Sequence, residues 1–105
     1  MISNEEEIMS TRIKTDQWVW VVIQDPGADE QFLGQHDPER NVSFIPLFLD
    51  KEAAEQGLGV LSRDRSRKYE VQAIRFDDLS ERAAENGFLL FVLNGKGDVL
   101  EKIGV

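Results

Sequence analysis

The residues best suited to chemistry in this sequence of 105 residues lie in the short segment His36-Asp37-Pro38-Glu39. An imidazole beside carboxylates is the arrangement that general acid–base catalysis uses, and both groups also bind metal ions. His36 is the one histidine of the chain, so a catalytic pair or a metal site would need further groups from elsewhere. Asp and Pro also occur in turns for backbone reasons alone. His36, Asp37 and Glu39 are therefore a candidate site for a small-ligand binder or an enzyme, and the alternative is an ordinary loop.

The chain lacks the residues that most other kinds of catalysis require. There is no cysteine, which removes disulfides, thiolate metal sites and cysteine nucleophiles. The glycine pairs in Gly57-Leu58-Gly59 and Gly95-Lys96-Gly97 match neither the phosphate-binding loop nor the dinucleotide fingerprint, and we interpret them as structural. We therefore predict no catalytic, cofactor-binding or metal-binding residue, and we expect no cofactor. The sequence favours a protein that is not an enzyme.

The charges are unevenly distributed along the chain. Twenty acidic residues against 12 basic residues give a net charge of −8, which argues against nucleic acid as a partner, because phosphate contacts need clustered Lys and Arg. Residues 24–40, the acidic stretch, hold five carboxylates and one arginine, a balance of −4. Residues 62–68, the basic loop, hold four cations and one aspartate, a balance of +3.

The basic loop supplies most of the candidate partner contacts. Its cations could bind an anion or a partner protein, and the alternative is a solvated loop between two elements. Phe32 is a further candidate, because an exposed aromatic ring in polar surroundings would be a contact anchor. The candidate contact residues are Arg63, Arg65, Arg67, Lys68 and Phe32.

Four strands are indicated by apolar patterns. The continuous apolar runs Trp18–Ile23 and Phe88–Leu93 are typical of strands covered on both faces. Alternation over residues 68–76 predicts a half-buried strand. A strand over residues 42–49 contains Pro46, which lacks a backbone donor, so we expect a sheet edge or a bulge there.

Two helices follow from capping signals. Asp50 is the expected N-cap of a helix from Lys51 to about residue 61. Asp78 and Glu81 have the spacing of a capping box, which predicts a second helix over residues 78–86. A hairpin then returns the chain over residues 99–103.

Together these elements predict an α+β fold, with α/β as the alternative. The expected order is β-(β)-β-α-β-α-β-β, where the bracketed element, near residues 31–34, is a short strand or a loop. We expect one mixed sheet of about five strands packed against two short helices. Residues 1–15 lack a clear period and are predicted to be a mobile lead-in, followed by a single α+β domain over residues 16–105.

One stretch carries a resemblance to a known group of proteins. Phe44-Ile45-Pro46-Leu47-Phe48 is followed by Lys51-Glu52-Ala53-Ala54. This resembles a family of small bacterial domains in which an F-I-P-x-F strand runs into a helix with acidic residues and paired alanines at its start. It is also similar to the N-terminal domain of SseB-type proteins, where a proline-bearing strand precedes a short helix. The likeness spans about residues 17–103, implies a bacterial cytoplasmic protein and transfers no site residue.

These observations favour a non-enzymatic interaction module of the cytoplasm. The longest apolar runs have six residues, whereas a membrane span needs roughly 20, so no membrane association is expected. The acidic N-terminus does not resemble a secretory signal. We expect a protein partner or self-association, the latter by edge pairing of the proline-bearing strand over residues 42–49 or of the C-terminal hairpin.

Overall fold

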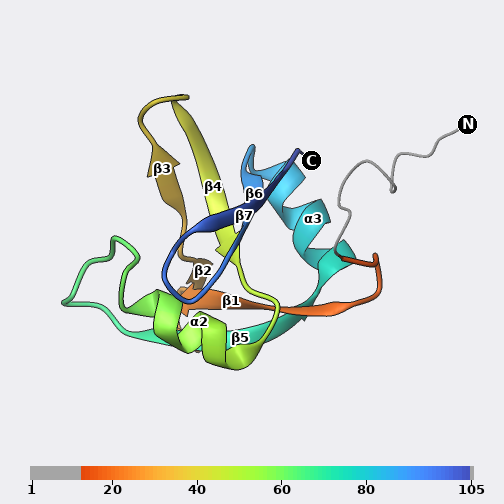
Figure 1. The fold of residues 1–105 in the computed structure, drawn as a ribbon. Helices are drawn as coiled ribbons and strands as arrows, with labels where there is room; N and C mark the ends of the chain where they lie inside the picture. Colours follow the sequence, from red (N-terminus) through yellow and green to blue (C-terminus); the bar gives the residue numbers. More distant parts are fainter. Residues whose placement is uncertain (1–12, 105) are drawn as a thin grey trace, which may run out of the picture.

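The computed structural model describes residues 13–104, and within them it has seven strands and two helices, an α+β fold as the sequence predicts (Figure 1). The additional strand is β3, which no apolar pattern indicates. The elements are β1 (Trp18–Gln24), β2 (Gln31–Phe32), β3 (Gln35–Asp37), β4 (Val42–Leu47), α2 (Lys51–Leu58), β5 (Tyr69–Arg75), α3 (Phe76–Glu85), β6 (Leu89–Leu93) and β7 (Val99–Ile103).

Instead of one mixed sheet of about five strands, these residues form two sheets. The β1 sheet has the order β2-β1-β5 and is antiparallel throughout. The β6 sheet has the order β3-β4-β6-β7, with β4 and β6 parallel and the outer pairs antiparallel. Trp20 and Phe48 join the sheets by exchanging backbone hydrogen bonds of 2.9 and 2.8 Å.

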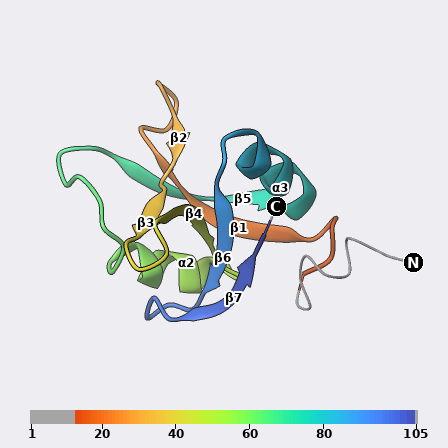
Figure 2. The same cartoon turned by 90° about the horizontal axis from the view of Figure 1, so that it is seen from above.

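The division into two sheets follows from two strands that are apolar on both faces. In β1, Val19 and Val21 lie in a core cluster with α3, whereas Val22 lies in a second cluster with α2. In β6, Leu90 and Phe91 are divided in the same way. Each strand therefore occupies the interior of its own sheet, which confirms the prediction of central strands covered on both faces. Figure 2 shows the two helices on different sides of these strands.

Pro46 lies where β4 has a neighbour in its sheet on one side only. β3 pairs with residues 42–44 of β4 and stops before Pro46, whereas β6 runs alongside Pro46 on the other side. β4 is thus internal in the strand order but locally an edge at its proline. The absence of a backbone N–H at Pro46 is therefore tolerated without a bulge.

The first helix begins as predicted, and the second begins earlier. The carboxylate of Asp50 accepts a hydrogen bond of 2.8 Å from the backbone N–H of Ala53, which confirms Asp50 as the N-cap of α2. α2 ends at residue 58 rather than near 61.

The prediction of a capping box at Asp78 and Glu81 is wrong, because α3 already begins at Phe76 and has no side-chain cap. The backbone N–H of Phe76 donates to the carbonyl oxygen of Gln17, at 2.8 Å, and that of Asp77 donates to Thr15, at 2.9 Å. The chain before β1 thus supplies the acceptors that a capping side chain would otherwise provide.

The predicted lead-in over residues 1–15 falls mostly outside the described residues, which begin at Ile13. Ile13 itself is only 7% exposed and packs into the cluster with α3. The packed part of the chain therefore includes Ile13, two residues before the predicted end of the lead-in.

Candidate functional site

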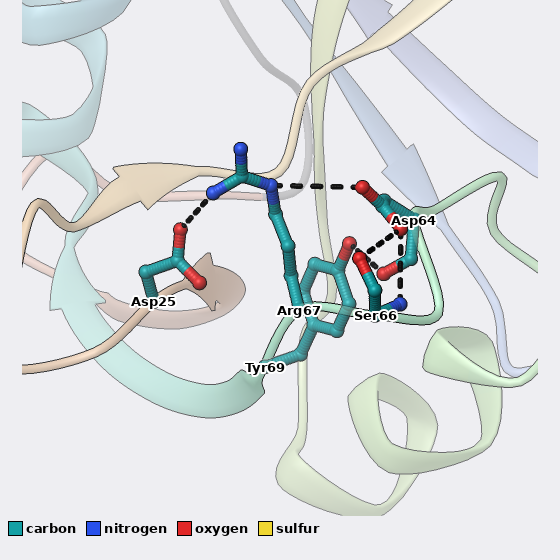
Figure 3. Close-up of polar contacts among 5 residues, drawn as sticks. All are labelled: Asp25, Asp64, Ser66, Arg67 and Tyr69. Atoms are coloured by element: carbon teal, nitrogen blue, oxygen red, sulfur yellow. Dashed lines mark hydrogen bonds and ion pairs between the residues drawn. The ribbon is translucent and has the colours of Figure 1, made fainter.

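The structure joins the basic loop to the acidic stretch. Arg67 of the basic loop pairs with Asp25, the residue after β1, at 2.6 Å between Nη1 and Oδ2. Its Nε also lies 3.7 Å from Oδ2 of Asp64 (Figure 3). Two segments that are separate charged regions in the sequence thus partly neutralise each other.

A local hydrogen-bond network orders the same loop. The carboxylate of Asp64 accepts from the hydroxyl of Ser66 at 2.7 Å and from its backbone N–H at 2.9 Å, while the hydroxyl of Tyr69 donates to the carbonyl oxygen of Asp64 (Figure 3). The Ser66 hydroxyl bond, followed by the backbone bond, lowers the pKa of Asp64 below its ordinary 3.8. The hydrogen bond to Asp25, in turn, raises the pKa of Arg67 above its ordinary value.

Arg63 is also committed to the fold. Its Nη1 donates to the carbonyl oxygens of Leu58 and Leu61, at 2.6 and 3.4 Å. A cation bound to the last carbonyls of a helix is stabilised there by the helix dipole. Arg63 is therefore a capping residue of α2.

Arg65 and Lys68 are the candidate contacts in the basic loop that remain available. Both are exposed, and neither side chain makes a hydrogen bond or ion pair to a described residue. A surface contact made by the basic loop would therefore use these two cations rather than all four.

His36 lies on a strand and is not brought together with the two carboxylates. It is exposed on β3, opposite Ser43 of β4. Asp37 follows it directly and so points to the other face of the strand, where its carboxylate accepts a hydrogen bond of 3.0 Å from the backbone N–H of Glu39. Asp37 and Glu39 thus build the turn after β3, and no acid–base pair with His36 is formed.

His36 does line a shallow hollow. This His36 hollow has a volume of about 470 Å³ and is also lined by Gly34, Gln35, Ser43, Ser62 and Phe88. The amide of Gln35 fixes one wall: it donates to the carbonyl oxygen of Ser62 at 2.7 Å and accepts from the Ser62 N–H at 3.0 Å. The hollow therefore presents one imidazole with hydroxyl and amide groups and an aromatic ring.

A larger hollow lies on the other side of Phe88. This Phe88 groove has a volume of about 590 Å³ and is lined by Glu30, Gln31, Phe32, Ile45, Arg82, Glu85, Asn86 and Phe88. β2, β4 and α3 supply most of its walls. Phe88 belongs to both linings, so its half-buried ring stands between the two hollows.

Phe32 is placed differently from the exposed anchor that the sequence suggested. It is half-buried and packs against the core cluster that contains α3, with its remaining surface in the Phe88 groove. The sequence reasoning missed Arg82, Glu85 and Phe88. Phe88 was assigned to a buried strand, and the two charged residues fall in the predicted helix over residues 78–86, where no local pattern distinguishes them.

Within the described residues, no group of three or more His, Asp or Glu side chains is placed to hold a metal ion. Neither described helix is long and apolar enough to cross a membrane. No protein-family model matches the chain, and comparisons with curated proteins and with solved structures likewise find no match.

Proposed function

We propose that this chain is a non-enzymatic interaction module of the bacterial cytoplasm that binds a basic segment of a partner protein in the Phe88 groove. The observation that carries the proposal is the lining of this groove. Phe32 and Phe88 offer apolar surface above the buried Ile45, and Glu30 and Glu85 add carboxylates beside it. The bacterial cytoplasm in this proposal rests on the resemblance of the F-I-P-x-F strand to bacterial domains.

The charge of the groove favours a cationic occupant. Arg82 is the one cation of its lining against the carboxylates of Glu30 and Glu85, a balance of −1. The whole chain carries −8. Complementary charge raises the rate of encounter and selects among partners, while the aromatic rings of Phe32 and Phe88 add apolar contact. A segment that combines Lys or Arg with an apolar side chain fits both features.

A peptide selection tests this proposal. Random peptides displayed on phage and selected on the immobilised protein should become enriched in sequences with a Lys or Arg next to an apolar residue. Glu85→Lys should weaken the binding of such a peptide by about tenfold, because it places a like charge in the groove. Glu55→Lys is the matched control, since Glu55 is exposed on α2, outside the groove, and the charge change is identical.

Two results would contradict the proposal. The first is a selection that enriches no basic peptide. The second is an equal loss of affinity in Glu85→Lys and Glu55→Lys, which would mean that the peptides sense only the net charge.

Binding of a small molecule in the His36 hollow is the second candidate function, alone or as part of an enzyme. It is favoured by the imidazole of His36, which shares the hollow with the hydroxyl groups of Ser43 and Ser62. Asp37 and Glu39 are not part of that lining, so His36 would act without them. The peptides separate the two functions: under the first proposal, His36→Gln leaves their affinity unchanged.

A further inference from the structure

β5 is an edge strand whose outward backbone groups are unpaired. It pairs with β1 along its whole length, and no described strand lies on its other side (Figure 1). The register shows which residues face β1: the N–H of Phe76 donates to Gln17, and the N–H of Asp25 donates to Lys68. Even-numbered residues of this segment thus bond to β1, because bonding alternates along an antiparallel strand.

The odd-numbered residues of β5 consequently present their backbone outward. Tyr69, Val71 and Ala73 each have an N–H and a C=O that point away from β1, and these groups bond to no described residue. At Arg75 only the N–H is available in this way, because Arg75 is the N-cap of α3 and its C=O accepts the first hydrogen bond of that helix. An unpaired row of this kind is a template for another strand.

We infer that β5 pairs antiparallel with β5 of a second copy of this chain, about a two-fold axis at Gln72. Gln72 is the central residue of the strand, so this register uses all of Tyr69–Arg75. It places Tyr69 opposite Arg75 of the second copy, and Val71 opposite Ala73. These are the residues with outward backbone groups. Each Val71–Ala73 pair exchanges two hydrogen bonds, and each Tyr69–Arg75 pair forms one, from the N–H of Arg75 to the carbonyl oxygen of Tyr69.

The side chains on β5 are compatible with this register. Its two charged residues are Glu70 and Arg75, and neither meets a like charge directly opposite. Glu70 faces Ile74 of the second copy, and Arg75 faces the ring of Tyr69. At the axis the amide of Gln72 meets its own copy, where it can both donate and accept.

The other edges fit a second copy less well. β2 has two residues and β3 has three, which leaves little to pair. A two-fold antiparallel pairing is always centred on a residue, so β7 would bring either Glu101 or Lys102 against itself near its middle. Like charges directly opposite each other are destabilising.

The dimer also leaves the Phe88 groove accessible. The groove is lined by Gln31 and Phe32 of β2, which is the opposite edge of the same sheet. The inference is therefore independent of the proposed function, and either can fail without the other.

A single cysteine tests the register directly. The chain has no cysteine, so Gln72→Cys introduces the only thiol. Directly opposite residues that do not share hydrogen bonds have Cα atoms about 4.5 Å apart, which lies within the range for a disulfide. With oxidised glutathione as the oxidant, Gln72→Cys should form a covalent dimer at least about tenfold faster than Leu100→Cys on β7, because pairing raises the effective thiol concentration. Equal rates for the two variants would overturn the inference.

Sedimentation equilibrium tests the edge without a covalent bond. The unaltered chain should show a reversible monomer–dimer equilibrium. Ala73→Pro removes an outward donor but no bond to β1, and it should raise the dimer Kd by about tenfold. Ala73→Lys, at the same exposed position, provides a second variant that keeps the backbone donor. A monomer at every concentration, or a dimer that both variants leave unchanged, would refute β5 pairing.

Discussion

Gly57 allows α2 to pack against the ring of Phe48. A Cβ atom at Gly57 would overlap the side-chain carbons Cε2 and Cζ of Phe48, which is fully buried in the cluster beneath α2. The glycine that weakens the helix in a propensity scale is thus required by the packing of the helix.

Gly57→Ala is therefore expected to lower the free energy of unfolding by about 1–3 kcal/mol, because an overpacked core shifts its side chains or backbone. Gly59→Ala, at the right-handed C-cap of the same helix, should leave that free energy unchanged or raise it by up to about 1 kcal/mol. Urea unfolding followed by tryptophan fluorescence measures both. A stable Gly57→Ala variant would mean that α2 can move away from Phe48.

Ser66 is expected to control the titration of Asp64. The folded pKa of Asp64 is lowered, so its hydrogen bonds favour the folded state above pH 3.8, and this contribution is lost as the pH falls through the folded pKa. Ser66→Ala removes the largest cause, so the Asp64 pKa should rise toward 3.8 and the acid dependence of stability just below that pH should weaken. A carboxyl ¹³C NMR titration measures the pKa, with Ser43→Ala as the control. An unchanged Asp64 pKa would assign the shift to the causes that remain in this variant, first the backbone N–H of residue 66 and then the charge of Arg67.

The pairing of residues far apart in sequence was the part of the site that sequence reasoning could not reach. Asp25 and Arg67 were each placed in a charged segment from composition alone. Their separation of 42 positions leaves no local pattern that would join them. Phe88 was found as an apolar strand residue, but its place between two hollows depends on β2, β3 and α3.

At the scale of elements, the two helices begin by different means. α2 has a side-chain cap at Asp50, whereas the first turn of α3 donates to backbone carbonyl oxygens before β1. The capping rule identified Asp50 because its signal is local. It misplaced the start of α3 because the acceptors there come from another segment.

Asp50→Ala should therefore lower the free energy of unfolding by about 1 kcal/mol through loss of the cap. Asp78→Ala should change it by less than about 0.5 kcal/mol, because Asp78 is an exposed residue within the helix rather than its cap. Urea midpoints of the two variants make the comparison. A larger loss in Asp78→Ala than in Asp50→Ala would restore the capping box.

At the scale of the whole molecule, the sequence predicted the strands better than their arrangement. The runs Trp18–Ile23 and Phe88–Leu93 indicated buried central strands because six consecutive apolar residues need cover on both faces. Nothing local indicated that these strands belong to different sheets. β3 was not predicted because Gln35, His36 and Asp37 have no apolar pattern. They form a strand through backbone pairing with β4.

The parallel pairing of β4 with β6 has a consequence for the synthesis of this protein. β4 ends at Leu47, but its parallel neighbour begins only at Leu89. A nascent chain therefore exposes the apolar side chains of β1 and β4 to the crowded interior of the cell until β6 has been translated. The β4–β6 pairing can therefore form only after β6 has been translated, and we expect a nascent chain arrested in the basic loop to be prone to aggregate.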